Sequence, residues 1–170
     1  MIRPMQVSDV PRVAEIHVFG WRMAYRGIVS DQHLFNNRLV SKSIEKFTQI
    51  INNSDTQNEM WGNNYVYDDG IVKAFLTIGP CRDEDKQDSY ELGGLYVDPC
   101  FKGQGIGRML AHHCEKIAKQ KGFTEICIWT FEKNTQARAF YENLGYVHDG
   151  VTQIVQPFDA VGVRYVKIPK

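Results

Sequence analysis

The chain has 170 residues, of which 43% are hydrophobic and 24% are charged, and its 20 basic and 20 acidic residues cancel to zero formal net charge. Its length is that of about one domain, both fractions are ordinary for a globular protein, and the charge balance argues against a dedicated nucleic-acid binder. No apolar run is long enough to span a membrane, and the four cysteines include no C-x-x-C pair. We therefore expect one soluble, cytoplasmic domain over residues 1–170, with reduced thiols and with no metal, nucleic-acid or membrane partner.

Helices are predicted in the first third of the chain. Ser8-Asp9 just before Pro11 is typical of a helix N-terminus. Apolar residues then recur at helical spacing as far as Tyr25, and Gly27 should end this helix. The other elements expected here are an edge strand or coil at residues 2–5, a helical stretch starting at Ser30 or Asp31, a helix over residues 41–51 and a polar loop over residues 52–58.

Strands are predicted from residue 60 onward. Two β-rich runs, residues 60–67 and 71–78, flank Asp68-Asp69-Gly70, and Asp-Gly between such runs is a strong hairpin signal. The strand–helix–strand unit from Tyr90 to Phe131 should be a parallel crossover. Later elements are expected as strands at 90–97, 125–131, 146–155 and 161–168, helices at 103–121 and 135–144, and a charged loop at 80–88. These elements predict an α/β (α+β) fold with a mixed, mostly antiparallel sheet of about six to seven strands.

A glycine-rich turn stands between the strand that ends at Val97 and the long helix that follows. The first amides of a helix have no partners inside it, and the helix dipole favours negative charge there. Glycines let the backbone approach an anion closely, and two cationic side chains add positive charge. The turn is a candidate pyrophosphate cradle, although a tight helix start would also need glycines. We call these residues the glycine turn: Lys102, Gly103, Gln104, Gly105, Ile106, Gly107 and Arg108.

Three phosphate-binding patterns can be tested on the glycine turn. A P-loop would need Lys-Ser or Lys-Thr after the glycines, and G-x-G-x-x-G fails because its last position falls on Arg108 or Leu110. The pattern [Q/R]-x-x-G-x-[G/A] fits Lys102, Gly105 and Gly107, with lysine in place of the usual glutamine or arginine. In this segment the chain resembles the GNAT superfamily of acetyl-CoA-dependent N-acetyltransferases.

A second segment strengthens the resemblance. The family pattern N-x-x-A-x-x-F-Y-x-x-x-G-[F/Y] is met at every fixed position from Asn134 to Tyr146. An ordinary amphipathic helix would also explain the apolar spacing of this segment. The order of the expected elements matches that of the family over nearly the whole chain. The resemblance therefore implies the GNAT fold, with helices on both faces of the sheet and a parallel strand pair splayed apart at the cofactor site.

The resemblance also implies roles in the use of acetyl-CoA. The backbone of Leu95, Tyr96 and Val97 would hold the pantetheine arm, and an amide of this stretch would stabilise the thioester oxyanion. The diphosphate would take amides from the glycine turn, and Asn134 would contact the cofactor arm. Tyr141 would be the general acid that protonates the departing CoA thiolate, since a phenol has a pKa of about 10.

The amine that accepts the acetyl group must lose a proton before it attacks, because alkylamines are mostly protonated at neutral pH. Glu91 lies eleven residues before Lys102, a spacing at which relatives carry a catalytic glutamate. It would share a strand face with Gly93 and Leu95 unless a bulge intervenes. We expect Glu91 to be the base, directly or through water; the alternative is an exposed carboxylate at a strand start.

The acceptor should approach from the other side of the strand gap, where the family's first helices lie. His17, Trp21 and Tyr25 are spaced i, i+4 and i+8, so they share one helix face that could hold a cationic amine by cation–π contact. A core face of the helix is the alternative. The charged loop over residues 82–88 could attract a polyamine or a basic peptide, or could simply be solvated.

The sequence thus predicts an enzyme that moves an acetyl group directly from acetyl-CoA to a primary amine of a small molecule or peptide. No covalent acyl-enzyme is expected, because Cys100 and Cys127 lack an adjacent histidine. A protein N-terminus or lysine is the alternative acceptor. A non-catalytic acyl-CoA sensor is the alternative class of protein, and the resemblance leaves a homodimer open.

Overall fold

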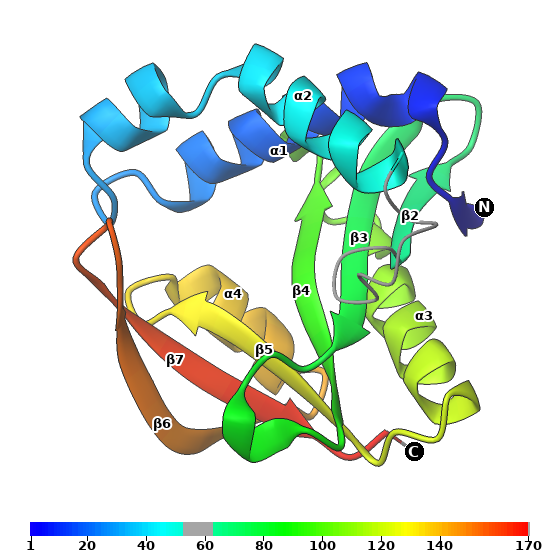
Figure 1. Cartoon of the computed structure of the whole chain (residues 1–170), viewed down its shortest axis with the longest axis vertical. Helices are drawn as coiled ribbons and strands as arrows, with labels where there is room; N and C mark the ends of the chain where they lie inside the picture. The colour runs from blue at the N-terminus through cyan, green and yellow to red at the C-terminus, as the bar shows by residue number, and fades with distance from the viewer. Residues whose placement is uncertain (53–62, 170) are drawn as a thin grey trace.

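The computed structural model describes residues 1–52 and 63–169 (Figure 1). The strands are β1 (Ile2–Pro4), β2 (Asn63–Asp68), β3 (Val72–Pro80), β4 (Ser89–Val97), β5 (Glu125–Phe131), β6 (Val147–Val155) and β7 (Ala160–Lys167). The helices are α1 (Val10–Ala24), α2 (Val40–Asn52), α3 (Ile106–Gln120) and α4 (Thr135–Glu142), with short turns η1 (Val7–Asp9), η2 (Gln32–Asn37), η3 (Glu84–Lys86) and η4 (Pro99–Phe101). None of the helices in these ranges is both long and apolar enough to cross a bilayer.

The strands form one sheet in the order β1-β2-β3-β4-β5-β7-β6. Neighbouring strands run antiparallel except β4 and β5, which run parallel and are connected through α3. The predicted mixed, mostly antiparallel sheet is therefore confirmed. The predicted hairpin joins β2 to β3, where the Asp68 carboxylate accepts a hydrogen bond from the Gly70 amide at 2.9 Å.

The parallel pair of β4 and β5 opens soon after it forms. Ser89, Tyr90 and Glu91 pair with β5, and the pairing goes no further along β4. The register with β3 shifts at Gly93, so β4 carries a bulge at this point. Figure 1 shows the two strands diverging from their paired ends. The splayed pair that the family resemblance implies is present, and it leaves two strand edges facing each other across a gap.

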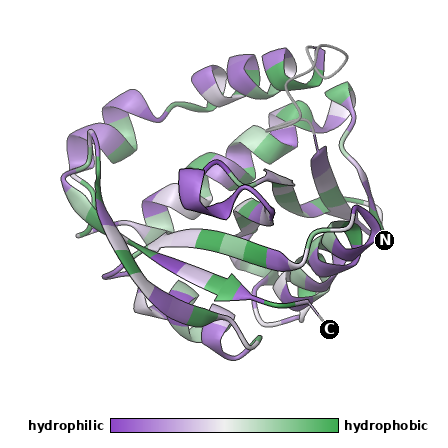
Figure 2. Cartoon of the chain, turned by 60° about the horizontal axis from the view of Figure 1, so that its bottom comes forward, coloured by the Kyte–Doolittle hydropathy of each residue, from purple (hydrophilic) through white to green (hydrophobic). Residues whose placement is uncertain are grey.

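Two apolar cores hold the sheet between layers of helices. On β3, Ala74 and Leu76 pack in the core with α3 and α4, while Phe75 between them packs in the core with α1 and α2. This division follows from the alternation of side chains along a strand. Hydrophobic and hydrophilic residues alternate along the helices in Figure 2, as expected for helices with one buried side. The predicted placement of helices on both faces is confirmed.

Several boundaries differ from the sequence predictions. The helix expected over 103–121 begins only at Ile106, because Gly103 and Gly105 have φ of 80° and 77° and so cannot continue a right-handed helix. The helix expected over 135–144 ends at Glu142. Of the loop expected over 52–58 only Asn52 is described, and it ends α2. The start of the run 60–67 also lies outside the described residues.

Candidate active site

A cavity of about 890 Å³ occupies the opening between β4 and β5. Its walls come from α1, the loop after β3, the second half of β4, the glycine turn, β5, α4 and the β6–β7 hairpin. Of the described residues, the predicted Glu91, Gln104 and His17 lie outside this lining. The predicted site residues that do line it are Trp21, Tyr25, Leu95, Tyr96, Val97, Lys102, Gly103, Gly105, Ile106, Gly107, Arg108, Asn134 and Tyr141.

Three glycines shape the turn at one end of this cavity. Gly105 is the residue that precedes α3, and like Gly103 it has a positive φ that strains any residue with a side chain. Gly107 has a different constraint, because a Cβ there would lie 3.3 Å from the Phe140 ring and 3.7 Å from a Leu95 methyl. The motif therefore needs glycine for conformation at two positions and for space at the third.

The same turn concentrates positive potential. The first turn of α3 contains no acidic residue, and its amides have no partners within the helix. The helix dipole adds to the charges of Lys102 and Arg108, which both line the cavity. This end of the cavity therefore suits a phosphate anion.

The second half of β4 turns backbone amides toward the opening. The amide of Asp98 donates to the carbonyl of Lys73 at 2.8 Å, one position beyond the paired residues Val97 and Ala74. Hydrogen-bonded and non-hydrogen-bonded pairs alternate along antiparallel strands. The amides of Val97 and Leu95 therefore face the opposite edge of β4, where β5 has moved away. This edge can bind an extended ligand through its backbone.

The helix α4 brings Tyr141 to the cavity wall. The side-chain oxygen of Asn134 starts this helix by accepting a hydrogen bond from the Ala137 amide at 3.2 Å, and Gly145 follows the helix with φ 85°. Tyr141 is 9% exposed, and burial raises the pKa of its phenol above the ordinary value. The phenol therefore keeps its proton at neutral pH and is able to donate it.

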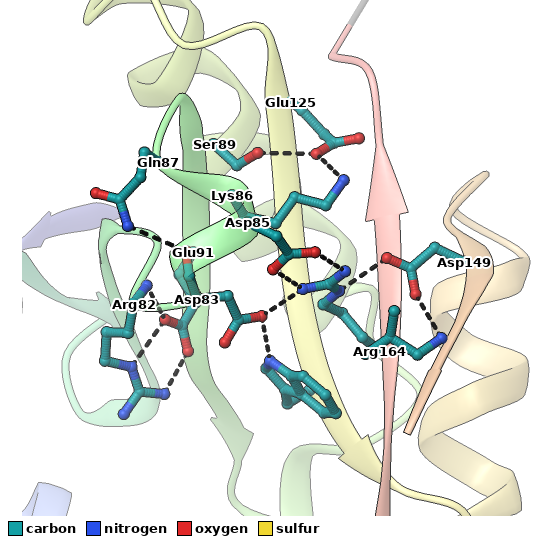
Figure 3. Close-up of polar contacts among 12 residues, drawn as sticks. Arg82, Asp83, Asp85, Lys86, Gln87, Ser89, Glu91, Glu125, Asp149 and Arg164 are labelled. Carbon is teal, nitrogen blue, oxygen red and sulfur yellow. Dashed lines mark hydrogen bonds and ion pairs between the residues drawn. The ribbon is translucent and has the colours of Figure 1, made fainter. Parts of the chain in front are cut away.

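Glu91 does not line the cavity, but it pairs with Arg82, which does. Its carboxylate accepts hydrogen bonds from Nε of Arg82 at 2.8 Å and from the Arg82 backbone amide at 3.3 Å, and it also pairs with a terminal nitrogen of the guanidinium (Figure 3). Glu91 is 4% exposed, whereas Arg82 lines the cavity. The bulge at Gly93 interrupts the alternation that would have put Glu91 on the same face as Leu95.

The α1 face predicted to hold the acceptor is divided between cavity and core. Trp21 and Tyr25 line the cavity, with ring centroids 4.6 Å apart. Burial lowers the pKa of His17 to about 3, so its imidazole is neutral. His17 instead packs edge-on against the rings of Phe47, Phe75 and Tyr96. Its position fits the alternative of a core residue, while the two aromatic residues fit the acceptor side.

Two charged cavity residues, Arg82 and Asp83, belong to no motif. Asp83 accepts hydrogen bonds from the indole of Trp129 at 2.9 Å and from the guanidinium of Arg164 at 2.9 Å. The sequence marked this loop only as a run of charges, because no local signal shows that it packs against β5 and β7. Phe158 in the β6–β7 hairpin was missed for the same reason; its ring lies 5.4 Å from that of Trp21.

The fold and this cavity together define an N-acetyltransferase. A model described as the Acetyltransferase (GNAT) family matches residues 21–146, which include the glycine turn, both arms of the splayed strand pair and the whole motif from Asn134 to Tyr146. Because the match covers most of the chain, this protein belongs to the GNAT acetyltransferase family. The resemblance inferred from the two sequence motifs is thereby confirmed.

Proteins named as N-acetyltransferases are similar to this chain over most of its length. The chain is 27% identical to the uncharacterized N-acetyltransferase YuaI of Bacillus subtilis, over 98% of this chain and 89% of that protein. It is 24% identical to the spermidine N(1)-acetyltransferase of Thermoplasma acidophilum, over 85% of this chain and 86% of that protein. A crystal structure of the PaiA N-acetyltransferase of Thermoplasma acidophilum in complex with coenzyme A shares the fold, with a TM-score of 0.76 and 22% identity over 99% of this chain and 98% of that one.

Proposed function

We propose that this enzyme transfers the acetyl group of acetyl-CoA directly to a primary amine of a small molecule or peptide. The observation that carries the proposal is one continuous cavity that joins the glycine turn, the open edge of β4, Tyr141 and the aromatic wall of α1. The glycine turn suits an anionic diphosphate, and the aromatic wall suits an amine. The coenzyme A in the similar Thermoplasma structure and the spermidine acetyltransferase among the relatives support this assignment.

The binding of acetyl-CoA would use the backbone more than the side chains. The first amides of α3 would bind the diphosphate, with Lys102 and Arg108 adding charge. The amides of Leu95 and Val97 would hold the pantetheine arm in the way that a strand edge holds an extended peptide. Asn134, at the start of α4, would contact the arm from the other wall.

The transfer step would use a backbone amide of β4 and the Tyr141 phenol of α4. An amide of Leu95 or Val97 would donate to the thioester oxygen, where negative charge develops as the amine nitrogen bonds to the carbonyl carbon. As the carbon–sulfur bond breaks, Tyr141 would give its proton to the leaving sulfur. A proton from the amine would leave toward Glu91, which sits behind Arg82, so its path would run through water rather than by direct contact.

The cysteines support transfer without a covalent intermediate. None of the four is among the described residues that line the cavity. The Cys127 thiol donates a hydrogen bond to Cys81, which raises the pKa of Cys127, and burial raises it further. The same bond lowers the pKa of Cys81, which lies outside the cavity lining. A thiol that keeps its proton is a weak nucleophile, so the acetyl group would pass to the amine directly.

Replacing Glu91 with glutamine is expected to lower kcat/KM about 100-fold at pH 7, the low end of the range typical of a lost general base. The deficit should shrink as the pH rises toward the pKa of the acceptor amine, because the free amine then no longer needs a base. Steady-state rates of wild type and Glu91→Gln from pH 7 to pH 10 measure this. A deficit of the same size at every pH would show that Glu91 only holds Arg82 in place.

The proposal as a whole is tested by calorimetry followed by a CoA-release assay. We expect acetyl-CoA and CoA to bind at micromolar concentrations, and CoA to be released only when an amine is added. A panel of polyamines, aminoglycosides, amino acids and N-terminal peptides then identifies the acceptor. Failure of both nucleotides to bind would exclude the proposed function, and a burst of CoA release without an amine would exclude direct transfer.

A further inference from the structure

The acidic side chain on the cavity wall lies on the other face of the sheet from Lys102 and Arg108. Along β5, Ile128 packs in the core with α3, and the next residue, Trp129, faces the other way and donates its indole N–H to Asp83. Asp83 therefore lies on the face of the sheet opposite α3, whose N-terminus carries Lys102 and Arg108. Among the described residues that line the cavity, Asp83 is the one with a carboxylate.

Asp83 is held firmly by its neighbours. Its Oδ2 accepts from Nε1 of Trp129 and from Nη1 of Arg164, both at 2.9 Å. The side chain of Gln87 donates to the Asp83 backbone carbonyl at 3.2 Å, which ties down the loop itself. Figure 3 shows Asp83 between the Glu91–Arg82 pair and Arg164. A carboxylate fixed in this way is organised for binding before the ligand arrives.

The negative charge of Asp83 is not cancelled by its cationic partner. Arg164 is buried and is shared by three carboxylates. Asp85 takes two of its hydrogen bonds, both at 2.7 Å, and Asp149 takes a third at 2.7 Å. Arg82, the loop cation that lines the cavity, is bound by Glu91. One guanidinium among three carboxylates leaves this cluster with net negative charge, and Asp83 is the member of the cluster that lines the cavity.

We propose that Asp83 is a specificity-determining residue that binds a second ammonium group of the acceptor, so that the enzyme prefers diamines and polyamines. The inference rests on the proposed acetyltransferase function. Oδ1 of Asp83 would accept the N–H of this ammonium, because Oδ2 already has two donors. The bound ammonium stays protonated, while the amine at the other end of the acceptor loses its proton and is acetylated. The rings of Trp21 and Tyr25 line the space between. The guanidinium of Arg38 already lies 3.3 Å from the centroid of the Trp21 ring, so the Tyr25 ring is the one left for a cation–π contact with the acceptor.

The test uses acceptors that share a chain and differ in charge at the far end. We would measure kcat/KM for diaminoalkanes of three to six carbons, for the monoamine of each length and for the corresponding amino acid with a terminal carboxylate. The best diamine should exceed its monoamine about tenfold or more, the size expected of one charge-assisted hydrogen bond in a partly enclosed site. The amino acid should be the poorest of the three. Added salt should raise KM for the diamine more than for the monoamine.

Asp83→Asn should remove the preference for the diamine while leaving the rate with the monoamine within about twofold. Asp88→Asn is the matched control, because Asp88 is an exposed carboxylate of the same loop that neither lines the cavity nor is one of the three paired with Arg164. It should keep the preference. The salt dependence of the wild-type enzyme gives a readout that does not depend on either variant folding.

Three results would overturn the inference. These are equal use of diamine and monoamine by the wild type, a diamine preference that survives in Asp83→Asn, and binding of CoA without acetylation of any aliphatic amine. None of them contradicts the proposed function itself, which fails if acetyl-CoA does not bind, if no amine of any kind is acetylated or if CoA is released in a burst without an amine.

Discussion

Replacing Tyr141 with phenylalanine is expected to lower kcat by about 100- to 1,000-fold, the range typical of a lost general acid. The affinity for CoA should change little, because the ring that packs against the cavity is kept. Burial raises the pKa of the Tyr141 phenol, so the wild-type acid stays protonated at and above neutral pH. The wild-type kcat should therefore show no loss of this acid below about pH 10, the ordinary pKa of a phenol. CoA-release kinetics at saturating substrates and calorimetry with CoA measure the two effects.

Tyr146 provides the control for this variant. It is buried beside Tyr141, with ring centroids 5.7 Å apart, and burial raises the pKa of its phenol as well. Its hydroxyl has no hydrogen-bond partner within the described part of the chain and it does not line the cavity. Tyr146→Phe should therefore leave kcat unchanged and should not lower stability. Equal kcat values for Tyr141→Phe and the wild type would remove Tyr141 from the catalytic role.

Replacing Gly105 with alanine is expected to weaken CoA binding about tenfold, which corresponds to about 1.4 kcal/mol. Gly105 has φ 77°, and a side chain in this left-handed region costs about 1–2 kcal/mol. Alanine relieves this strain in the free protein by moving the turn, and the strain returns when the amides of α3 bind the diphosphate. The strain is then subtracted from the binding free energy. Calorimetry with CoA measures the change in Kd.

A variant of Gly122, at the other end of α3, is the control that separates the effect of backbone strain on stability from its effect on CoA binding. It has φ 85°, and a Cβ would meet no atom within 4 Å at either Gly105 or Gly122. Gly122 lies outside the cavity lining. Gly122→Ala should lower the free energy of unfolding and leave the affinity for CoA unchanged. If the two variants bind CoA equally well, the turn is not the diphosphate site.

The parts of the fold that the sequence predicted well depend on neighbours in the chain. The hairpin at Gly70, the start of α4 at Asn134 and its end before Gly145 are set by the conformations that these residues favour. The boundary at residue 103 was wrong because the same glycines can start a helix or precede one. Only the positive φ of Gly103 and Gly105 in the structure shows that they precede it.

The acceptor side could not be predicted to the same degree. The helical spacing put His17 on one face with Trp21, but spacing does not show where a face passes from cavity to core. The alternation along β4 put Glu91 with Leu95, and a bulge of one residue at Gly93 broke that pattern. In both places a local period ends at a point where tertiary packing changes it.

The sequence by itself determined the family. It also predicted the proposed cofactor-binding turn, because an anion cradle at a helix start is built from consecutive residues whose backbone freedom is visible in their identity. Only the tertiary structure decided which charged residues lie on the proposed acceptor side. Glu91 is paired with Arg82 across a strand loop, and Asp83 lies against Arg164, 81 residues away. Such contacts are made when β5 and β7 pack beside the loop after β3. The sequence alone therefore does not show that these charged residues belong to the site, because the folded sheet brings them together.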